Sequence, residues 1–253
     1  MAQFLRTRLL LGKDKFIRLE KARVTVFGLG AVGSYATEAL ARAGVGSLRL
    51  VDFDKIKITN INRQLYALHS TLGRSKAEVA KARVLDINPA CKVETFEMFA
   101  AQDTIEGLLD NKPDLVVDAI DAFNPKVQLL SYCYKKGIPV ISSMGAALRT
   151  DPASIKVADI FESHTCPLAY RLRKGLRRQG VGKGILCVYS SQPPQAPGVD
   201  ADSLNEGDDF IRGRKRLIMG SLPTITGLFG LTIAHCAIEY LSGTGRPERK
   251  ARK

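Results

Sequence analysis

The sequence feature that most constrains the fold is a β-α-β pattern within residues 24–52. Two apolar runs, 24–27 and 48–51, predict buried strands, and residues 34–42 between them predict a helix. A strand, a helix and a strand in this order form the building block of a parallel sheet that is covered by helices. The pattern therefore favours an α/β fold before any other part of the chain is considered.

The turn between the first strand and the helix carries the pattern Gly28-x-Gly30-x-x-Gly33. Gly28 permits a tight turn, Gly30 lets the backbone approach phosphate oxygens, and Gly33 lets the helix pack closely on the strand. The helix start directs free N–H groups and the positive end of the helix dipole at an anion. Asp52 follows the second strand, where an acid can bind ribose hydroxyls. These residues predict a nucleotide site without deciding which nucleotide it holds.

The polar residues that follow Asp52 favour a triphosphate. Asp54, the segment Asn60-Ile-Asn62-Arg63-Gln64 and the segment Gly73-Arg-Ser-Lys76 all come shortly after the second strand. Arg63 and Lys76 would bracket a triphosphate, because its charge needs cations. A polar loop and a solvated helix start at Lys76 would produce the same cluster. The residues by themselves leave both interpretations open.

A further apolar run, Leu115-Val-Val-Asp118-Ala-Ile-Asp121, predicts a buried strand that ends in two acids. Because the carboxyl ends of parallel strands meet at one edge of a sheet, both acids are expected on the rim of the nucleotide site. Mg²⁺ binds through one or two carboxylates together with substrate phosphates, so a paired-acid rim suits it. Asp118 is equally suited to a turn or a helix cap, which makes Asp121 the candidate metal ligand.

The rest of the chain continues the alternation of strands and helices. The pattern predicts helices over 76–90, 103–110 and 125–136 and strands over 91–96, 139–143 and 155–160. This is typical of a Rossmann-like, doubly wound and mostly parallel sheet with helices on both faces. We expect a single ATP-binding domain over 1–253, with a nucleotide-binding core at 1–160. Residues 161–253 are expected to add a basic helical and loop region and a closing C-terminal helix.

The charge of the chain favours a polyanionic partner. Its 38 Lys and Arg against 25 Asp and Glu give a formal net charge of +13, which favours a partner such as nucleic acid. Basic clusters at 170–178, 212–216 and 246–253 have few acids nearby. They predict contact with a phosphate backbone.

Other features exclude some classes of protein. The five cysteines form no CxxC pair, so neither a structural zinc nor a disulfide framework is predicted. The N-terminal apolar piece, 9–11, is too short for a signal peptide, and a cytoplasmic protein is expected. Residues 217–241 carry no Lys or Arg but are diluted by polar residues, and they predict a buried core helix rather than a membrane span. The Pro- and Gly-rich segment 192–209 predicts a mobile loop.

These motifs occur together in one known superfamily. The glycine turn, Asp52 with Asp54, the segment 60–64, the segment 73–76 and Asp121 resemble the ubiquitin-activating-enzyme (ThiF/MoeB/HesA) superfamily, whose members adenylate carboxylates. The match covers roughly residues 5 to 160. It implies ATP and Mg²⁺ as ligands. The ATP-binding residues that it implies are Gly28, Gly30, Gly33, Asp52, Asp54, Asn60, Arg63, Gln64, Lys76 and Asp121, with Asp121 also serving Mg²⁺.

The resemblance also implies which residues take part in the reaction. Arg63, Lys76 and Asp121 would act within one chain. Arg6 matches the superfamily's N-terminal arginine, which enters the site of the partner subunit. A homodimer is therefore expected.

Later segments are similar to one branch of the superfamily, the tRNA threonylcarbamoyladenosine dehydratases. These segments are 145–152, 155–159 and 166–173. Members of the branch use ATP to cyclise a threonylcarbamoyl group on the adenosine beside the anticodon, which implies a tRNA substrate and a carboxylate acyl-adenylate. Some members carry a cysteine in a Gly-rich C-terminal segment, which would suit a sulfur-transfer partner. The comparable segment here, 219–221, has none.

Three other functions remain open from the sequence. An adenylyltransferase that activates the C-terminus of a ubiquitin-like or sulfur-carrier protein would share the motifs, but the missing CxxC pairs and the charge of +13 disfavour it. An NAD-dependent oxidoreductase would use Asp52 on a ribose, but no His/Arg or Tyr/Lys pair of a substrate domain is evident. A non-catalytic RNA-binding protein would keep the nucleotide fold without the reaction.

Overall fold

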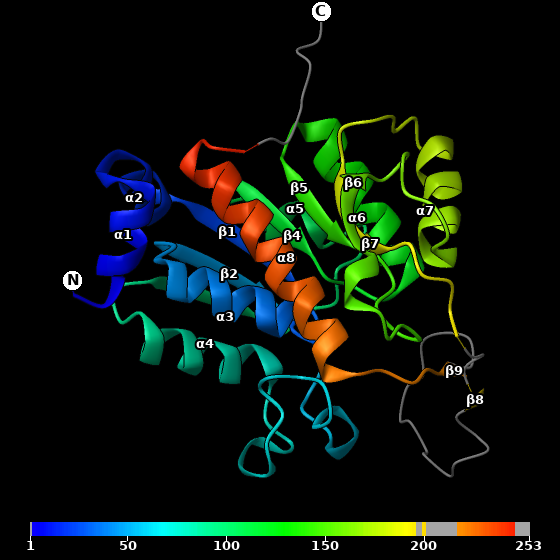
Figure 1. The fold of residues 1–253 in the computed structure, drawn as a ribbon, viewed down its shortest axis with the longest axis horizontal. Coiled ribbons are helices and arrows are strands. Elements are labelled where there is room, and N and C mark those ends of the chain that lie inside the picture. Colours follow the sequence, from blue (N-terminus) through cyan, green and yellow to red (C-terminus); the bar gives the residue numbers. More distant parts are fainter. Residues whose placement is uncertain (1, 196–198, 201–216, 246–253) are drawn as a thin grey trace, which may run out of the picture.

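A seven-stranded sheet forms the centre of the protein in the computed structural model, which describes residues 2–195, 199–200 and 217–245 (Figure 1). Its strands are β1 (Arg23–Phe27), β2 (Ser47–Val51), β3 (Lys92–Phe96), β4 (Leu115–Asp118), β5 (Val140–Ser143), β6 (Ile155–Asp159) and β7 (Leu186–Ser190). Their order is β3-β2-β1-β4-β5-β7-β6. All neighbours run parallel except β6, which pairs antiparallel with β7. A separate ribbon joins β8 (Val199–Asp200) to β9 (Leu217–Ile218).

Helices cover both faces of the sheet. The layer on one face holds α3 (Gly33–Ala43), α4 (Lys76–Ile87) and α8 (Pro223–Ser242), and the other holds α5 (Ile105–Leu108), α6 (Phe123–Lys136) and α7 (Pro167–Arg178). Two further helices, α1 (Leu5–Leu11) and α2 (Lys13–Lys21), lie beside the first layer (Figure 1). Short 3-10 turns are η1 (Ala2–Phe4), η2 (Ile58–Asn60), η3 (His69–Thr71) and η4 (Pro152–Ser154). The predicted Rossmann-like fold is confirmed.

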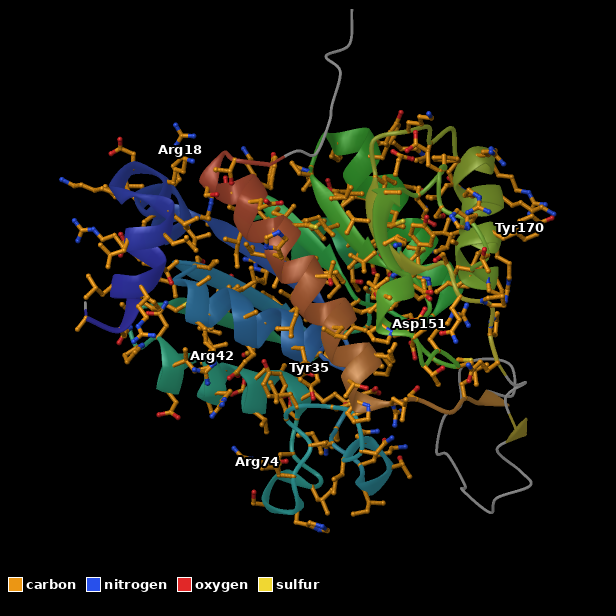
Figure 2. All side chains as sticks on the ribbon, in the orientation of Figure 1. Arg18, Tyr35, Arg42, Arg74, Asp151 and Tyr170 are labelled. Carbon is orange, nitrogen blue, oxygen red and sulfur yellow. The ribbon has the colours of Figure 1, made fainter. Side chains whose placement is uncertain are left out.

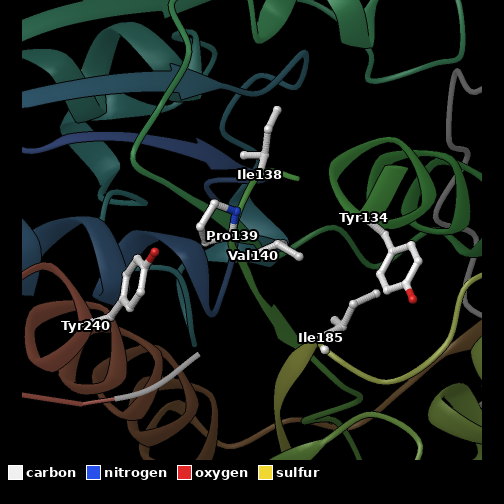
Figure 3. A pocket seen from close by; sticks show the side chains of 7 residues that line it. Tyr134, Ile138, Pro139, Val140, Ile185 and Tyr240 are labelled. Atoms are coloured by element: carbon white, nitrogen blue, oxygen red, sulfur yellow. The ribbon is translucent and has the colours of Figure 1, made fainter. Parts of the chain in front are cut away.

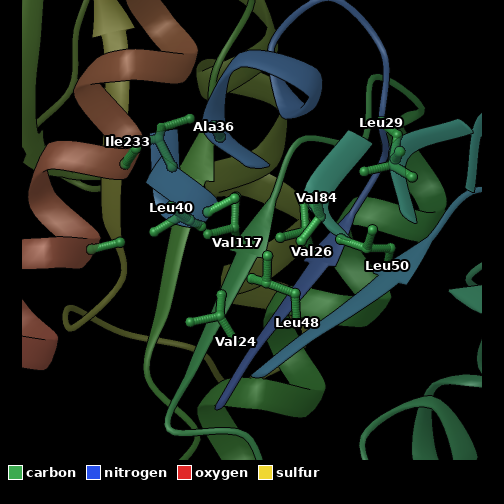
Figure 4. Packing of buried hydrophobic residues seen from close by; sticks show 14 of the residues in the cluster. Val24, Val26, Leu29, Ala36, Leu40, Leu48, Leu50, Val84, Val117 and Ile233 are labelled. Carbon is green, nitrogen blue, oxygen red and sulfur yellow. The ribbon is translucent and has the colours of Figure 1, made fainter. Parts of the chain in front are cut away.

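The alternation of side chains along each strand explains the two layers. In β4, Leu115 and Val117 pack into the layer of α3 and α8, whereas Val116 packs into the opposite layer. Figure 4 shows Val117 beside Leu40 of α3, with Ile233 of α8 close by. Full burial of such a side chain stabilises the fold by about 1.5–3 kcal/mol. Because both faces are covered, these strands form continuous apolar runs in the sequence.

Helix α8 belongs to the core, as predicted. Ile225, Phe229 and Ile233 are buried in the first layer. A Cβ at Gly230 would lie 2.4 Å from the backbone oxygen of Val32, so this glycine lets α8 cross α3 at close range. By length and composition alone, α8 is also apolar enough to cross a membrane, and 50% of its apolar window is buried here.

The structure differs from the expected pattern after residue 160. The expected pattern lacks β7, which enters the sheet between β5 and β6 with α7 as its crossover. Residues 161–190 therefore complete the same sheet, and no boundary lies at residue 160. The run Leu186–Ser190 is as long as β1 and β2, but the sequence interpretation assigned no element to it.

Several C-terminal segments that were interpreted from the sequence lie outside the described residues. Most of the segment 192–209 lies outside the described residues, as do the basic clusters 212–216 and 246–253. Within the first of these segments, Val199–Asp200 form β8 rather than irregular loop.

Candidate active site

The predicted site residues gather beyond the carboxyl ends of β1, β2 and β4. The chain leaves β1 through α3 on one face of the sheet and leaves β4 through α6 on the other. The order of the sheet reverses between these two neighbouring strands. A crevice at such a switch point is where open α/β sheets bind nucleotides. The topology of the sheet and the glycine motif therefore both predict a nucleotide site at the carboxyl ends of β1 and β4.

The three glycines of the turn differ in how closely their neighbours pack: Gly28 and Gly33 have no room for a side chain, whereas Gly30 does. A Cβ at Gly28 would lie 2.7 Å from the oxygen of Ala119, and one at Gly33 would lie 1.8 Å from the oxygen of Gly28. Gly28 also has a φ of +84°, which favours glycine. A Cβ at Gly30 would meet nothing closer than Gln64 Nε2, at 3.7 Å. Packing thus requires two of the glycines, and the third leaves backbone exposed to a ligand.

Asp52 ties the glycine turn to the end of β2. Its Oδ2 accepts a hydrogen bond from Leu29 N–H at 2.6 Å, and its Oδ1 accepts one from Asp54 N–H at 2.9 Å. Burial raises the pKa of Asp52, and the nearby Lys76 ammonium opposes that shift. Each carboxylate oxygen keeps a second lone pair, so a ribose hydroxyl can still bind here.

Lys76 stands at the first turn of α4, which Ser75 caps by accepting from Glu78 N–H. Its Nζ lies 2.8 Å from Asp54 Oδ2, and the side chain is nearly buried while 40% of the Asp54 side chain is exposed. An ammonium has three donors. Asp54 takes one of them, which leaves Lys76 able to share a phosphate.

The segment after η2 carries the other predicted cation. Arg63 is half-buried, and its Nη1 donates to the Thr59 carbonyl and to Asn62 Oδ1, each at 2.8 Å. Burial lowers the pKa of Arg63, and the carboxylate of Asp121 is near enough to oppose the shift. A guanidinium has five donors, so Arg63 keeps several for a phosphate. The structure thus brings Arg63 within electrostatic range of Asp121, although 58 positions in the sequence separate them.

Two amides of the same segment are buried and shape it. Asn60 Oδ1 accepts from Lys57 N–H at 3.2 Å, which holds the turn at η2. Gln64 faces Gly30. All the predicted nucleotide-binding residues of the core therefore lie around the glycine turn, at the switch point where a nucleotide crevice is expected.

The two acids that follow β4 have different environments, and the expectation of a paired-acid rim is wrong. Asp121 is exposed beside the crevice. Asp118 is completely buried: its Oδ1 accepts from Ile120 N–H, and its Oδ2 accepts from Ser142 Oγ–H at 2.7 Å. Because its side chain is completely buried and both oxygens are bonded inside the protein, Asp118 is not available to a metal ion.

Sequence reasoning missed the partner of Asp118. Lys126 Nζ lies 2.8 Å from Asp118 Oδ2, and both side chains are fully buried. Lys126 also donates to the Ile120 carbonyl at 3.0 Å. The signal was present, because Lys126 lies on the apolar stripe of Leu129, Leu130 and Cys133 at helical spacing. A lysine on a buried stripe needs a buried counter-ion.

Arg6 lies away from this crevice within its own chain. It sits on α1, exposed to solvent, and the adjoining Phe4 packs near Gly44 at the C-terminal end of α3. The glycine turn is at the other end of α3, about 16 Å away for a helix of that length. A single chain therefore does not bring Arg6 to the site.

Two further observations bear on ligands. A small hollow lined by Pro139, Val140, Ile185 and Tyr240 lies at the amino ends of β5 and β7, at the opposite edge of the sheet (Figure 3). Within the described residues, no group of three or more His, Cys, Asp and Glu could hold a metal by itself. Mg²⁺ needs only one or two carboxylates when phosphates supply the rest. The exposed Asp121 beside a phosphate-binding turn fits that requirement.

The fold and the site define a class of protein. The ThiF family model matches residues 4–253. The chain therefore belongs to the ThiF family, and the resemblance drawn from the motifs is confirmed.

The relatives within this family are more specific. The chain is 43% identical over 230 residues to the tRNA threonylcarbamoyladenosine dehydratase of Bacillus subtilis, covering 89% of this chain and 90% of that one. Structures of the Escherichia coli tRNA N6-threonylcarbamoyladenosine dehydratase in complex with AMP and with ATP match with TM-scores of 0.85 and 0.84, at 33% and 32% identity, and cover 96% of this chain and 94% of those chains. The molybdopterin-synthase adenylyltransferase of Salmonella typhimurium is 36% identical over 148 residues, 58% of each chain.

Proposed function

We propose that this protein is an ATP-dependent dehydratase that cyclises the threonylcarbamoyl group of N6-threonylcarbamoyladenosine in tRNA. The observation that carries the proposal is the gathering of Asp52, Lys76 and Arg63 around the glycine turn, with Asp121 within electrostatic range of Arg63. Similarity to the dehydratases over 89% of the chain supports it, because the match includes the region after residue 160. The similarity to the adenylyltransferase covers only 58%.

In the first step, the substrate carboxylate attacks the α-phosphorus of ATP. The bond from that phosphorus to the bridging oxygen breaks, pyrophosphate leaves and an acyl-adenylate forms. Negative charge builds up on the phosphate oxygens, and preorganised cations lower the barrier. Arg63 and Lys76 would supply these cations from the rim, and Asp52 would orient the ribose.

In the second step, the ureido nitrogen of the same substrate attacks the activated acyl carbon. The bond between that carbon and the AMP oxygen breaks, the nitrogen loses its proton and AMP leaves. The nucleoside has then lost the elements of one water. The reacting groups belong to one molecule, so positioning alone gives a high effective molarity. This route uses no protein nucleophile.

The proposal includes Mg²⁺, with Asp121 as its protein ligand. The ion would neutralise charge on the phosphates of ATP. Asp121 would also hold the guanidinium of Arg63 at the crevice, since the two groups already interact. We place the activity in the cytoplasm, where the five free cysteines would stay reduced.

We also infer that the active form is a homodimer, in which Arg6 enters the partner subunit's crevice. In one chain, α1 exposes Leu9 and Leu10, with 74% and 86% of their surfaces accessible. Neighbouring exposed leucines on one helix mark a contact surface. No part of the proposal requires a sulfur-transfer partner.

Mixing two inactive variants tests the dimer. Arg6→Ala and Arg63→Ala should each lose activity. If Arg6 acts across the dimer, each mixed dimer has one crevice with both changes and one with neither. Random exchange should then restore about a quarter of the sites. If Arg6 acts within its own chain, mixing restores nothing and this part of the proposal is wrong.

The function itself is tested by mass spectrometry of tRNA nucleosides. Incubation of the protein with ATP and tRNA that carries threonylcarbamoyladenosine should remove one water from that nucleoside. Arg63→Ala should abolish the change. ATP–pyrophosphate exchange stimulated by a carrier protein and not by tRNA would instead indicate the adenylyltransferase function.

A further inference from the structure

The expected basic helix is α7, and it has one buried face and one charged face. Ala169, Leu172 and Leu176 are fully buried in the second layer. The outer face carries Tyr170, Arg171, Lys174, Arg177 and Arg178, all exposed. Figure 2 shows Tyr170 pointing outward from α7. The helix Pro167–Arg178 contains no Asp or Glu.

Five exposed residues of one helix, four of them cations, gather on the outer face of α7 without acidic partners, unlike some basic residues elsewhere in the described chain. Arg83 pairs with Glu38, and Arg49 pairs with Glu94 and Asp110. In the part of the chain that the structure describes, no carboxylate forms a salt bridge with a cation of α7. Uncompensated charge on one face costs free energy through repulsion, so a partner that supplies anions would relieve it.

Aromatic rings lie among these cations. The guanidinium of Arg171 is 4.8 Å from the ring centre of Phe123, and that of Arg177 is 5.2 Å from Phe161. Lys174 Nζ is 4.4 Å from the ring centre of Tyr170. Cation–π contacts hold long side chains along the surface. An exposed ring beside a cation also suits stacking on an RNA base.

The basic face begins at the rim of the candidate active site. Phe123, which holds Arg171, starts α6 two residues after Asp121. At the N-terminal end of α7, Cys166 Sγ lies 3.7 Å from the Cβ position of Gly145, just beyond the carboxyl end of β5. From this rim α7 runs along the outside of the molecule for about 18 Å.

We propose that the outer face of α7, defined by Tyr170, Arg171, Lys174, Arg177 and Arg178, binds the sugar–phosphate backbone of the substrate tRNA. Arg171 is linked to the candidate site by its contact with Phe123, two residues after Asp121. The inference rests on the proposed function, which names tRNA as the substrate. Unpaired positive charge favours a polyanion, and the aromatic residues together with the position near the candidate site favour RNA over an acidic protein or an anionic membrane.

The test is a charge reversal on this face with a matched control. Lys174→Glu with Arg178→Glu changes two exposed side chains. Lys15→Glu with Lys21→Glu changes the net charge by the same amount on α2, at the other side of the molecule (Figure 1). Binding to tRNA that carries threonylcarbamoyladenosine is measured by fluorescence anisotropy at several salt concentrations, and thermal unfolding verifies that each variant folds.

The α7 variant should bind tRNA at least about tenfold more weakly, and the slope of log Kd against log salt should become shallower by about 1.4–1.8 for two lost phosphate contacts. KM for tRNA should rise while KM for ATP stays within about twofold. A milder pair, Lys174→Ala with Arg178→Ala, should show the same trend at smaller size. The α2 control should bind tRNA like the unmodified protein.

Two results would overturn the inference. One is equal loss of tRNA affinity in the α7 and α2 variants, which would mean that only net charge matters. The other is unchanged tRNA binding by the α7 variant together with lost binding to phosphatidylserine vesicles, which would assign the face to a membrane. If the unmodified protein binds tRNA through this face but never dehydrates the nucleoside, the proposed function fails and the surface assignment stands.

Discussion

Two ion pairs between a lysine and an aspartate lie near the candidate site. They have the same geometry but differ in how far the aspartate is buried. Lys126 and Asp118 are 2.8 Å apart and both fully buried. Lys76 and Asp54 are also 2.8 Å apart, but 40% of the Asp54 side chain is exposed. The first pair also binds the backbone of Ile120 and the hydroxyl of Ser142.

The difference in burial distinguishes an ion pair that holds the fold together from one that can contact a ligand. A buried charge is stable only with its partner, because water cannot replace the partner. Lys126 therefore fixes the loop that packs against Gly28 and displays Asp121. When the acid of an ion pair is partly exposed, water can replace its contact with the lysine at little cost in free energy. Lys76 can accordingly turn from Asp54 toward a phosphate.

The strongest way to test this division is Lys126→Met. The change leaves Asp118 charged and buried without a cation, and it should destabilise the protein by about 3–5 kcal/mol. Urea unfolding measures the loss. The double variant Lys126→Met with Asp118→Asn should recover part of it, because no charge is then buried. A loss below about 1 kcal/mol for the single variant would show that the pair is not structural.

Lys76→Ala should affect activity more than stability. Loss of one preorganised cation should lower kcat for ATP–pyrophosphate exchange by about 10²–10³-fold. Lys81→Ala on the same helix is the matched control and should leave exchange unchanged. Equal exchange rates in the two variants would remove Lys76 from the phosphate site.

The glycines of the turn allow the same comparison between a residue required for packing and a residue that faces the ligand. Gly33→Ala places a methyl 1.8 Å from the oxygen of Gly28, and relief of that overlap should cost about 1–3 kcal/mol or more. Gly30→Ala meets nothing closer than 3.7 Å, so its stability should change by less than about 0.5 kcal/mol. Its ATP affinity should nevertheless fall, because the methyl occupies the approach of a phosphate. Thermal unfolding and ATP titration separate the two effects.

Of the changes to the two ion pairs, the smallest effect on stability is expected from Asp54→Asn. Asp54 is partly exposed, so water can take the place of its carboxylate beside Lys76, and the free energy of unfolding should fall by only about 1 kcal/mol. Asp118→Asn is the comparison and should cost several times more, since it leaves Lys126 unpaired inside the protein. If the two variants were equally stable in urea, exposure would not be what distinguishes the pairs.

Much of the site could be predicted from the sequence, because its residues lie in short contiguous motifs. The glycine turn, Asp52 and the segment 60–64 each follow a recognisable strand, and parallel strands bring such segments to one edge. Lys126 and Ser142 could not be found in this way, because each acts on Asp118 from a different element, 8 and 24 positions away. The strand β7 was not predicted either, and its place between β5 and β6 is visible only in the topology of the sheet.

The sequence by itself determined the α/β class, the nucleotide turn and the family, since each depends on local spacing and residue type. Only the tertiary structure decided which acid faces the crevice and which lies beneath it, because burial depends on contacts from α6 and β5. It also decided that the basic helix α7 packs against α6, which starts two residues after Asp121, rather than lying in a separate extension. That contact exists because β7 returns the chain to the sheet, which places α7 against α6 at the rim.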